Sequence, residues 1–93
     1  MTLAIVWSTQ ARNQYLASLQ RIANEDPMTA DLVQKRVEKS LQLLCDFPDM
    51  GTSAPLPGVP SCPVPKTGHS LDYRVVQDQI RIQRWYRQRQ SAQ

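Results

Sequence analysis

The chain has 93 residues, of which 41% are hydrophobic and 20% charged, and its formal net charge is +3. This length supports one core, and the balance of apolar and charged residues excludes a disordered chain, a collagen or a coiled coil. The longest apolar run, Leu3–Trp7, is far below the ~20 residues of a membrane span, and no secretory signal is visible. We therefore expect one cytoplasmic domain over residues 1–93, without membrane contact and with a frayed tail at 88–93.

The first half of the sequence predicts a strand and then a helix. Leu3–Trp7 is short, apolar and rich in β-branched residues, which is typical of a strand buried on both faces. Ser8 or Thr9 can then cap a helix of about 16 residues. Apolar residues recur along it every three or four positions, which predicts one buried stripe. The stripe consists of Ala11, Tyr15, Leu16, Leu19, Ile22 and Ala23.

A second helix follows almost at once. Asp26 can cap it, and Pro27 suits its first position. Its predicted buried face consists of Val33, Val37, Leu41 and Leu44. So short a connection favours an antiparallel hairpin of helices.

The second helix must end at Phe47, because Pro48 excludes helical geometry at the preceding residue. Residues 48–65 then contain six of the seven prolines. Each proline removes a backbone donor, so this stretch forms at most an edge strand around residues 59–64, or else a loop.

After Gly68 the apolar residues recur every second position, which predicts a β-hairpin with a turn at Gln77-Asp78. A two-residue turn would place Val75 opposite Ile80 on the core side. On the outer side it would place Arg74 opposite Arg81, Asp72 opposite Gln83 and Ser70 opposite Trp85, whereas a four-residue loop would separate the arginines. The predicted fold is therefore α+β: a strand, a helix hairpin and a mainly antiparallel sheet of three to four strands, in the order β-α-α-β-β-β.

The charge is concentrated in the last third of the chain. Residues 66–93 carry six cations and two acids, whereas residues 1–65 carry five cations and six acids. Five of the six cations are arginine, which binds carboxylates and phosphates well, so this region is either a solvated surface or a site for an anionic partner. Cys45, Cys62 and the single His69 lack the spacing of a zinc site, and we expect reduced thiols, no metal and no cofactor.

Several short motifs occur in a characteristic order: Trp7-Ser8, Phe47-Pro48-Asp49-Met50-Gly51, Pro57-Gly58-Val59, Leu71-Asp72-Tyr73-Arg74-Val75 and Ile80-Arg81-Ile82. In this order the chain resembles the RelE/ParE toxin superfamily of bacterial type II toxin–antitoxin systems. The resemblance implies a growth-inhibiting toxin, a role in plasmid stabilization and a cognate antitoxin. The antitoxin would use the proline-broken edge near residues 55–65 and a groove beside the helices.

Three departures from the superfamily pattern bear on the activity. Pro60 stands where such toxins usually carry an arginine, Thr52 follows Gly51 where a basic residue is common, and Tyr86 or Arg87 stands where many carry a histidine. These differences favour a ParE-like inhibitor of DNA gyrase without chemistry of its own.

Two other functions stay open at this point. A RelE-like endonuclease acting on ribosome-bound messenger RNA would need an acid–base pair and cations, for which His69, Arg81 and Tyr86 are the candidates. A non-toxic regulatory or nucleic-acid-binding domain is the third reading. The expected surface for a target or an antitoxin consists of Arg74, Arg81, Arg84, Trp85, Arg87 and Arg89, and a dimer is left open.

Overall fold

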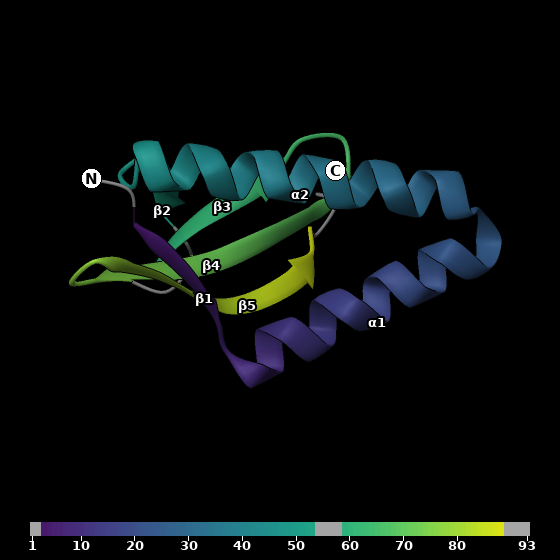
Figure 1. Ribbon diagram of the computed structural model, residues 1–93, viewed down its shortest axis with the longest axis horizontal. Helices are drawn as coiled ribbons and strands as arrows, with labels where there is room; N and C mark the ends of the chain where they lie inside the picture. The colour runs from purple at the N-terminus through teal and green to yellow at the C-terminus, as the bar shows by residue number, and fades with distance from the viewer. Residues whose placement is uncertain (1–2, 54–58, 89–93) are drawn as a thin grey trace, which may run out of the picture.

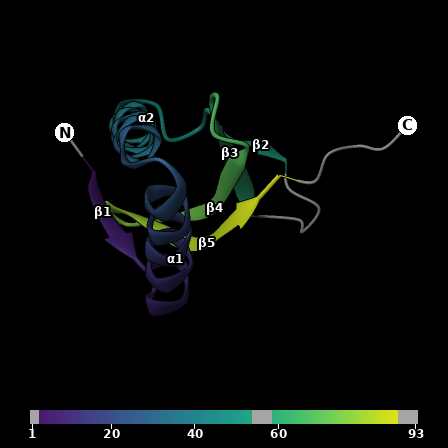
Figure 2. The ribbon, with the colours of Figure 1, turned by 90° about the vertical axis from the view of Figure 1, so that its right-hand side faces the viewer.

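The computed structural model describes residues 3–53 and 59–88. In chain order the elements are β1 (Ala4–Trp7), α1 (Thr9–Glu25), α2 (Pro27–Asp46), β2 (Thr52–Ser53), β3 (Pro60–Val64), β4 (His69–Val76) and β5 (Gln79–Arg87). The two helices form one layer on a five-stranded sheet of order β1-β5-β4-β3-β2 (Figures 1 and 2). β1 is parallel to β5, and the other neighbours are antiparallel.

The predicted α+β fold is confirmed, and the two-residue β2 is an addition to it. Of the tail that was expected to fray, all but Gln88 lies outside the described residues. Neither helix in the described ranges is long and apolar enough to cross a membrane.

The junction between the helices is fixed by Asp26. Its backbone N–H donates to the carbonyl of Ile22 at 2.8 Å, which closes α1. Its carboxylate accepts from the N–H of Met28 at 3.1 Å and from the hydroxyl of Thr29 at 2.8 Å, which caps α2. These hydrogen bonds, first that from Thr29, lower the pKa of Asp26. One residue thus ends one helix and begins the next, as the sequence predicts.

The core lies between the helices and the middle of the sheet. From α2 it takes Val33, Val37 and Leu44, and from the sheet it takes Cys62, Val64, Leu71, Tyr73, Ile80, Ile82 and Trp85. Leu16, expected on the buried stripe of α1, is 48% exposed. It lies about 100° around the helix from Tyr15, beyond the line of contact with the sheet.

One prediction about strands is wrong and another is confirmed. β1 is not buried on both faces: among the described residues it pairs with β5 alone, as an edge strand, and Val6 on its outer face is 39% exposed. The strand predicted around residues 59–64 is present as β3, and β2 pairs with its first two residues, Pro60 and Ser61.

The chain between α2 and β2 is held by Tyr73. Its hydroxyl donates to the carbonyl of Pro48 at 2.6 Å and accepts from the N–H of Gly51 at 3.0 Å. A Cβ atom at position 51 would lie 2.7 Å from Cε1 of Tyr73, which requires glycine there. Burial raises the pKa of Tyr73, so it remains a donor. The glycine of the motif Phe47-Pro48-Asp49-Met50-Gly51 is therefore explained by its close contact with the Tyr73 ring.

Candidate functional site

The β4–β5 hairpin presents two directly opposed arginines. The turn at Gln77-Asp78 is the expected two-residue turn, with Gln77 at a φ of 57° as such turns require. Arg74 lies opposite Arg81, and both are exposed on the face of the sheet away from the helices. Arg81 donates through Nε to the Gln79 side chain at 3.1 Å. Within residues 3–53 and 59–88, neither arginine has an ion pair with a carboxylate.

Beyond this pair the register changes, because β5 contains a β-bulge. Tyr73 lies opposite Ile82, whereas Asp72 lies opposite Arg84, so Gln83 is the extra residue. The expected pairs Asp72–Gln83 and Ser70–Trp85 are therefore wrong. A register shift of one residue exchanges the faces of all later side chains.

The bulge places Trp85 in the core instead of on the outer surface. Trp85 lies opposite Leu71 and is 2% exposed, while Tyr86 moves to the outer face. Indole Nε1 donates to the hydroxyl of Ser18 at 3.0 Å. The sequence placed Trp85 on the surface for a target or an antitoxin, whereas the structure buries it in the core.

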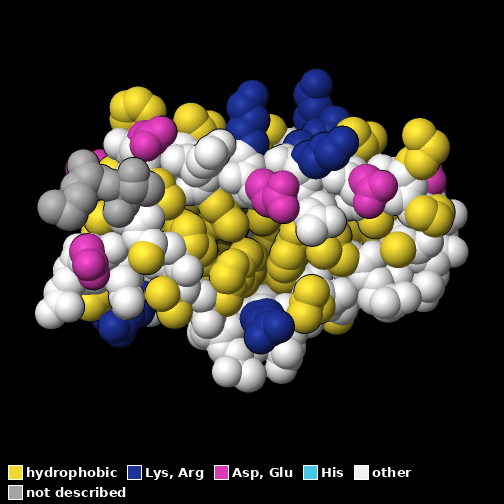
Figure 3. Space-filling view, viewed as in Figure 1, with side chains coloured by type: hydrophobic (Ala, Val, Ile, Leu, Met, Phe, Trp, Pro, Cys, Tyr) yellow, Lys and Arg dark blue, Asp and Glu magenta, His cyan; other side chains and the backbone are white. Residues whose placement is uncertain are grey.

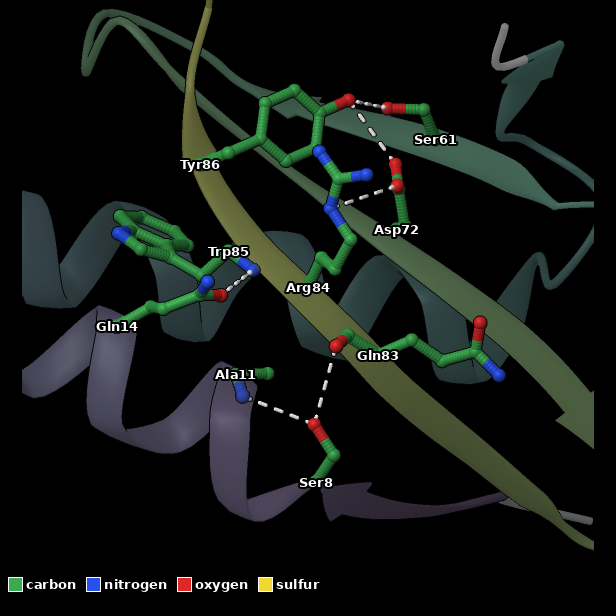
Figure 4. Close-up of polar contacts among 9 residues, drawn as sticks. All are labelled: Ser8, Ala11, Gln14, Ser61, Asp72, Gln83, Arg84, Trp85 and Tyr86. Atoms are coloured by element: carbon green, nitrogen blue, oxygen red, sulfur yellow. Dashed lines mark hydrogen bonds and ion pairs between the residues drawn. The ribbon is translucent and has the colours of Figure 1, made fainter. Parts of the chain in front are cut away.

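Side chains at the start of α1 satisfy the polar groups that the bulge leaves unpaired. The hydroxyl of Ser8 accepts from the N–H of Ala11 at 3.0 Å and donates to the carbonyl of Gln83 at 3.2 Å (Figure 4). The Gln14 side chain accepts from the backbone N–H of Trp85 at 3.1 Å. Because buried backbone groups need partners, these contacts hold the bulge and hence the faces of Arg84, Trp85 and Tyr86.

On the outer face, Asp72 is the centre of a polar network (Figure 4). The hydroxyl of Tyr86 donates to Asp72 at 3.1 Å and lies 2.8 Å from the hydroxyl of Ser61. Nε of Arg84 lies 3.7 Å from the Asp72 carboxylate, and its guanidinium lies 4.9 Å from the centre of the Tyr86 ring. Asp72 is buried and Arg84 lies beside it, so within the described ranges Arg74 and Arg81 are the arginines of this face without a carboxylate partner.

The three candidate residues for an endonuclease, His69, Arg81 and Tyr86, lie apart from one another. His69 lies on the helix side of the sheet, where its ring stacks on Trp85 with centroids 4.8 Å apart. Tyr86 lies on the opposite face, and Arg81 is five residues away along β5, near the turn. The chain therefore does not bring His69, Arg81 and Tyr86 together around one reacting group.

The ring of His69 is hydrogen-bonded to the backbone. Its Nδ1 atom lies 3.0 Å from the carbonyl of Thr67, and because a carbonyl can only accept, the ring is the donor. Burial, with Arg21 and Arg87 nearby, lowers the pKa of His69. The ring is therefore neutral at physiological pH.

The predicted contact residues divide between two faces. Arg74, Arg81 and Arg84 share the outer face, whereas Arg87 lies opposite His69 at the other end of the hairpin. Arg89 lies outside the described residues. Both cysteines, Cys45 and Cys62, are free thiols, as predicted.

The other prominent surface is an apolar groove on the helix side. Figure 3 shows hydrophobic side chains in a hollow between α2 and the edge formed by β1 and α1. The partly exposed hydrophobic residues that these elements pack against the core are Leu3, Ile5, Trp7, Tyr15, Leu19, Ile22, Leu41 and Cys45. The sequence indicated a groove beside the helices but not that β1, as an edge strand, would form one of its walls.

Three aromatic rings connect this groove with the hairpin. Trp7 stacks on Tyr15 with centroids 5.0 Å apart, and Tyr15 meets Trp85 edge to face at 4.9 Å. Burial, with the carboxylate of Glu38, raises the pKa of Tyr15 to about 12. The three rings therefore pack as one aromatic cluster between β1, α1 and β5.

The comparison with known proteins agrees with this arrangement. The family model described as the ParE toxin of the type II toxin-antitoxin system, parDE, matches residues 5–92. A solved structure of the chromosomal ParDE toxin–antitoxin system from P. aeruginosa has the same fold, with a TM-score of 0.80 and 19% sequence identity over 95% of this chain and 98% of that chain. No curated protein matches the sequence.

The order of elements, a strand, a helix hairpin and a mainly antiparallel sheet, together with these matches, is consistent with the RelE/ParE superfamily of type II toxins. Within it, the match over nearly the whole chain shows that the protein belongs to the ParE toxin family.

Proposed function

We propose that this toxin acts by binding and inhibiting DNA gyrase, without cleaving RNA, and that a cognate antitoxin neutralises it. The observation that carries the proposal is the exposed pair Arg74 and Arg81, which face each other across β4 and β5 without a carboxylate partner in the described part of the chain. Like charges directly opposed across a sheet are destabilising, so a sequence selected for stability alone would avoid the pair.

The chemistry of this surface favours an acidic protein partner. Two guanidinium groups side by side offer planar sets of N–H donors that suit carboxylates. Arg84 stands on the same face, although it already contacts Asp72. The dispersed positions of His69, Arg81 and Tyr86 support inhibition by binding over the nuclease reading.

The antitoxin is expected to use the other layer of the molecule. An apolar groove beside a helix hairpin suits the apolar face of an amphipathic helix, which would cover Trp7, Tyr15 and Leu19. The groove and the Arg74–Arg81 surface lie on opposite sides of the sheet, so the two partners would meet different residues.

The test compares two reactions of the purified protein in parallel: inhibition of gyrase supercoiling, and cleavage of ribosome-bound messenger RNA. We expect inhibition of supercoiling, and a loss of at least about tenfold in the variant R74E/R81E, because interactions of this type contribute about 1.5–3 kcal/mol each. The matched control is R12E/K35E, which reverses two exposed helix cations elsewhere. Codon-specific cleavage of the message, or full inhibition by R74E/R81E, would refute the proposal.

The antitoxin part is tested separately with Leu19→Glu, which places a charge in the groove. This variant should keep its effect on gyrase and lose binding to the product of the adjacent antitoxin gene. If Leu19→Glu binds the antitoxin as tightly as the parent does, the groove is not the docking site.

A further inference from the structure

A second concave site lies between α1 and the far end of the β4–β5 hairpin. It is a cavity of about 300 Å³ whose wall includes Arg21 and Glu25 of α1, His69 at the start of β4 and Arg87 at the end of β5. Ile22, which belongs to the partly exposed apolar set of the groove, also lines this cavity, whereas the four charged or titratable residues belong neither to that set nor to the Arg74–Arg81 surface. Its volume is at the small end of the range for ligand pockets.

The charged side chains around this cavity have no partner in the part of the chain that the structure describes. Within residues 3–53 and 59–88, no hydrogen bond or ion pair engages the guanidinium of Arg21 or of Arg87, or the carboxylate of Glu25. Arg21 and Arg87 come from different elements and both act electrostatically on His69, which lies at the wall of the same cavity. Two arginines and one glutamate leave one positive charge in excess, which suits a ligand with a single negative charge.

His69 adds a fixed hydrogen-bond acceptor. Its ring is held by stacking on Trp85 and by the contact of Nδ1 with the carbonyl of Thr67 at 3.0 Å. Since a carbonyl can only accept, the proton is on Nδ1, and Nε2 carries a free lone pair. Nε2 has no hydrogen-bond partner among the residues that the structure describes.

We propose that this cavity binds the phosphate group of a phosphate monoester. Its oxygens would accept from Arg21 and Arg87, and its remaining hydroxyl would donate to Nε2 of His69. The second pKa of such a group is about 6, so about half of the monoester carries this proton at pH 6 and about a tenth at pH 7, and binding should strengthen as the pH falls toward 6. A carboxylate with the same charge has no proton to donate, and this difference is what selects phosphate.

The test uses the purified full chain in phosphate-free buffer at about pH 6, where the singly charged form of both probes is well populated, with NMR of the His69 ring nitrogens and of the backbone amides at 67–69. Inorganic phosphate and adenosine 5′-monophosphate are the probes, and adenosine and acetate are the comparisons. We expect both phosphates to shift Nε2 of His69 in a saturable way, the monoester to bind at least as tightly as phosphate, and adenosine to bind not at all.

The variants R21Q and R87Q should each weaken phosphate binding about tenfold or more, since a charged hydrogen-bonding partner is lost. The control R12Q removes an exposed arginine of the same helix and should leave the affinity unchanged. All three side chains are exposed, and equal melting temperatures would confirm that the variants fold.

Four results would overturn the proposal: no saturable shift with phosphate, equal binding of acetate, unchanged affinity in both pocket variants, or a monoester that binds more weakly than free phosphate. The readout needs neither gyrase nor antitoxin. Its failure is therefore distinct from failure of the proposed function.

Discussion

Replacing Gln14 tests whether α1 holds the β-bulge of β5. The Gln14 side chain accepts from the backbone N–H of Trp85 at 3.1 Å, where the extra residue Gln83 interrupts the ladder. In Gln14→Ala this N–H loses its partner beside a side chain that is 2% exposed. A buried donor without an acceptor costs about 1–3 kcal/mol of the free energy of unfolding.

That loss is large for a chain of this size. A change of 1 kcal/mol shifts the melting temperature of a 60–100-residue domain by about 4–8 °C. Gln14→Ala should therefore melt at least about 4 °C lower than the parent, measured by circular dichroism. Hydrogen exchange of the Trp85 amide should also become faster, by about tenfold for each 1.4 kcal/mol lost.

Two matched variants separate the lost acceptor from other effects. Gln14→Glu keeps an oxygen that can accept and should remain close to the parent, whereas Gln10→Ala truncates an exposed glutamine of the same helix and should have little effect. If Gln14→Ala and Gln10→Ala have the same melting temperature, then Gln14 does not stabilise the bulge and the reasoning is refuted.

Three further predictions concern stability and pH. Gly51→Ala should lower the free energy of unfolding, measured by chemical denaturation, by about 1–3 kcal/mol, because the added methyl group would lie 2.7 Å from Cε1 of the Tyr73 ring. An unchanged denaturation midpoint would show that the segment between α2 and β2 can move away from the ring. The pKa of His69 is lowered in the folded protein, so the unfolded chain binds a proton more readily and the free energy of unfolding should fall as the pH drops below about 6.5. His69→Gln should show a shallower fall in melting temperature between pH 8 and 5.5 in phosphate-free buffer. Equal dependence of the two melting temperatures on pH would contradict this. Arg81→Glu replaces the repulsion between Arg74 and Arg81 by an attraction between opposite charges. It should raise the free energy of unfolding by about 0.2–1 kcal/mol and weaken gyrase inhibition, with both measured on the same sample. A variant less stable than the parent would argue against the observed register.

The helices and their junction could be predicted because their signals are local. Ser8, Asp26, Pro27 and Phe47 define the helix ends through their own backbone chemistry, and each acts within a few residues. The turn at Gln77-Asp78 belongs to the same class, since its register follows from the apolar alternation on either side.

The bulge could not be predicted, because its cause is not local. Gln83 is an ordinary residue in an alternating segment, and what stabilises the bulge is Ser8 and Gln14, about 70 residues earlier in the chain. The status of β1 was missed for a related reason: an apolar run does not show whether a strand has one neighbour or two.

This one register shift also explains why the arginines at the basic end of the chain lie on two faces of the sheet. Before Gln83, odd-numbered positions of β5 face outward, so Arg81 joins Arg74 on the outer surface. After it, even-numbered positions face outward, so Arg84 meets Asp72 while Arg87 turns toward the helix side and His69. Without the bulge, Arg81 and Arg87 would share one face as a single basic stripe. Deleting Gln83 removes only the extra residue, so the regular ladder that results should keep Arg84 opposite Asp72 and Trp85 in the core, with Arg74 still opposite Arg81. Indole fluorescence of the deletion variant should therefore report buried tryptophan, and an emission shifted to that of an exposed indole would contradict this account of the register.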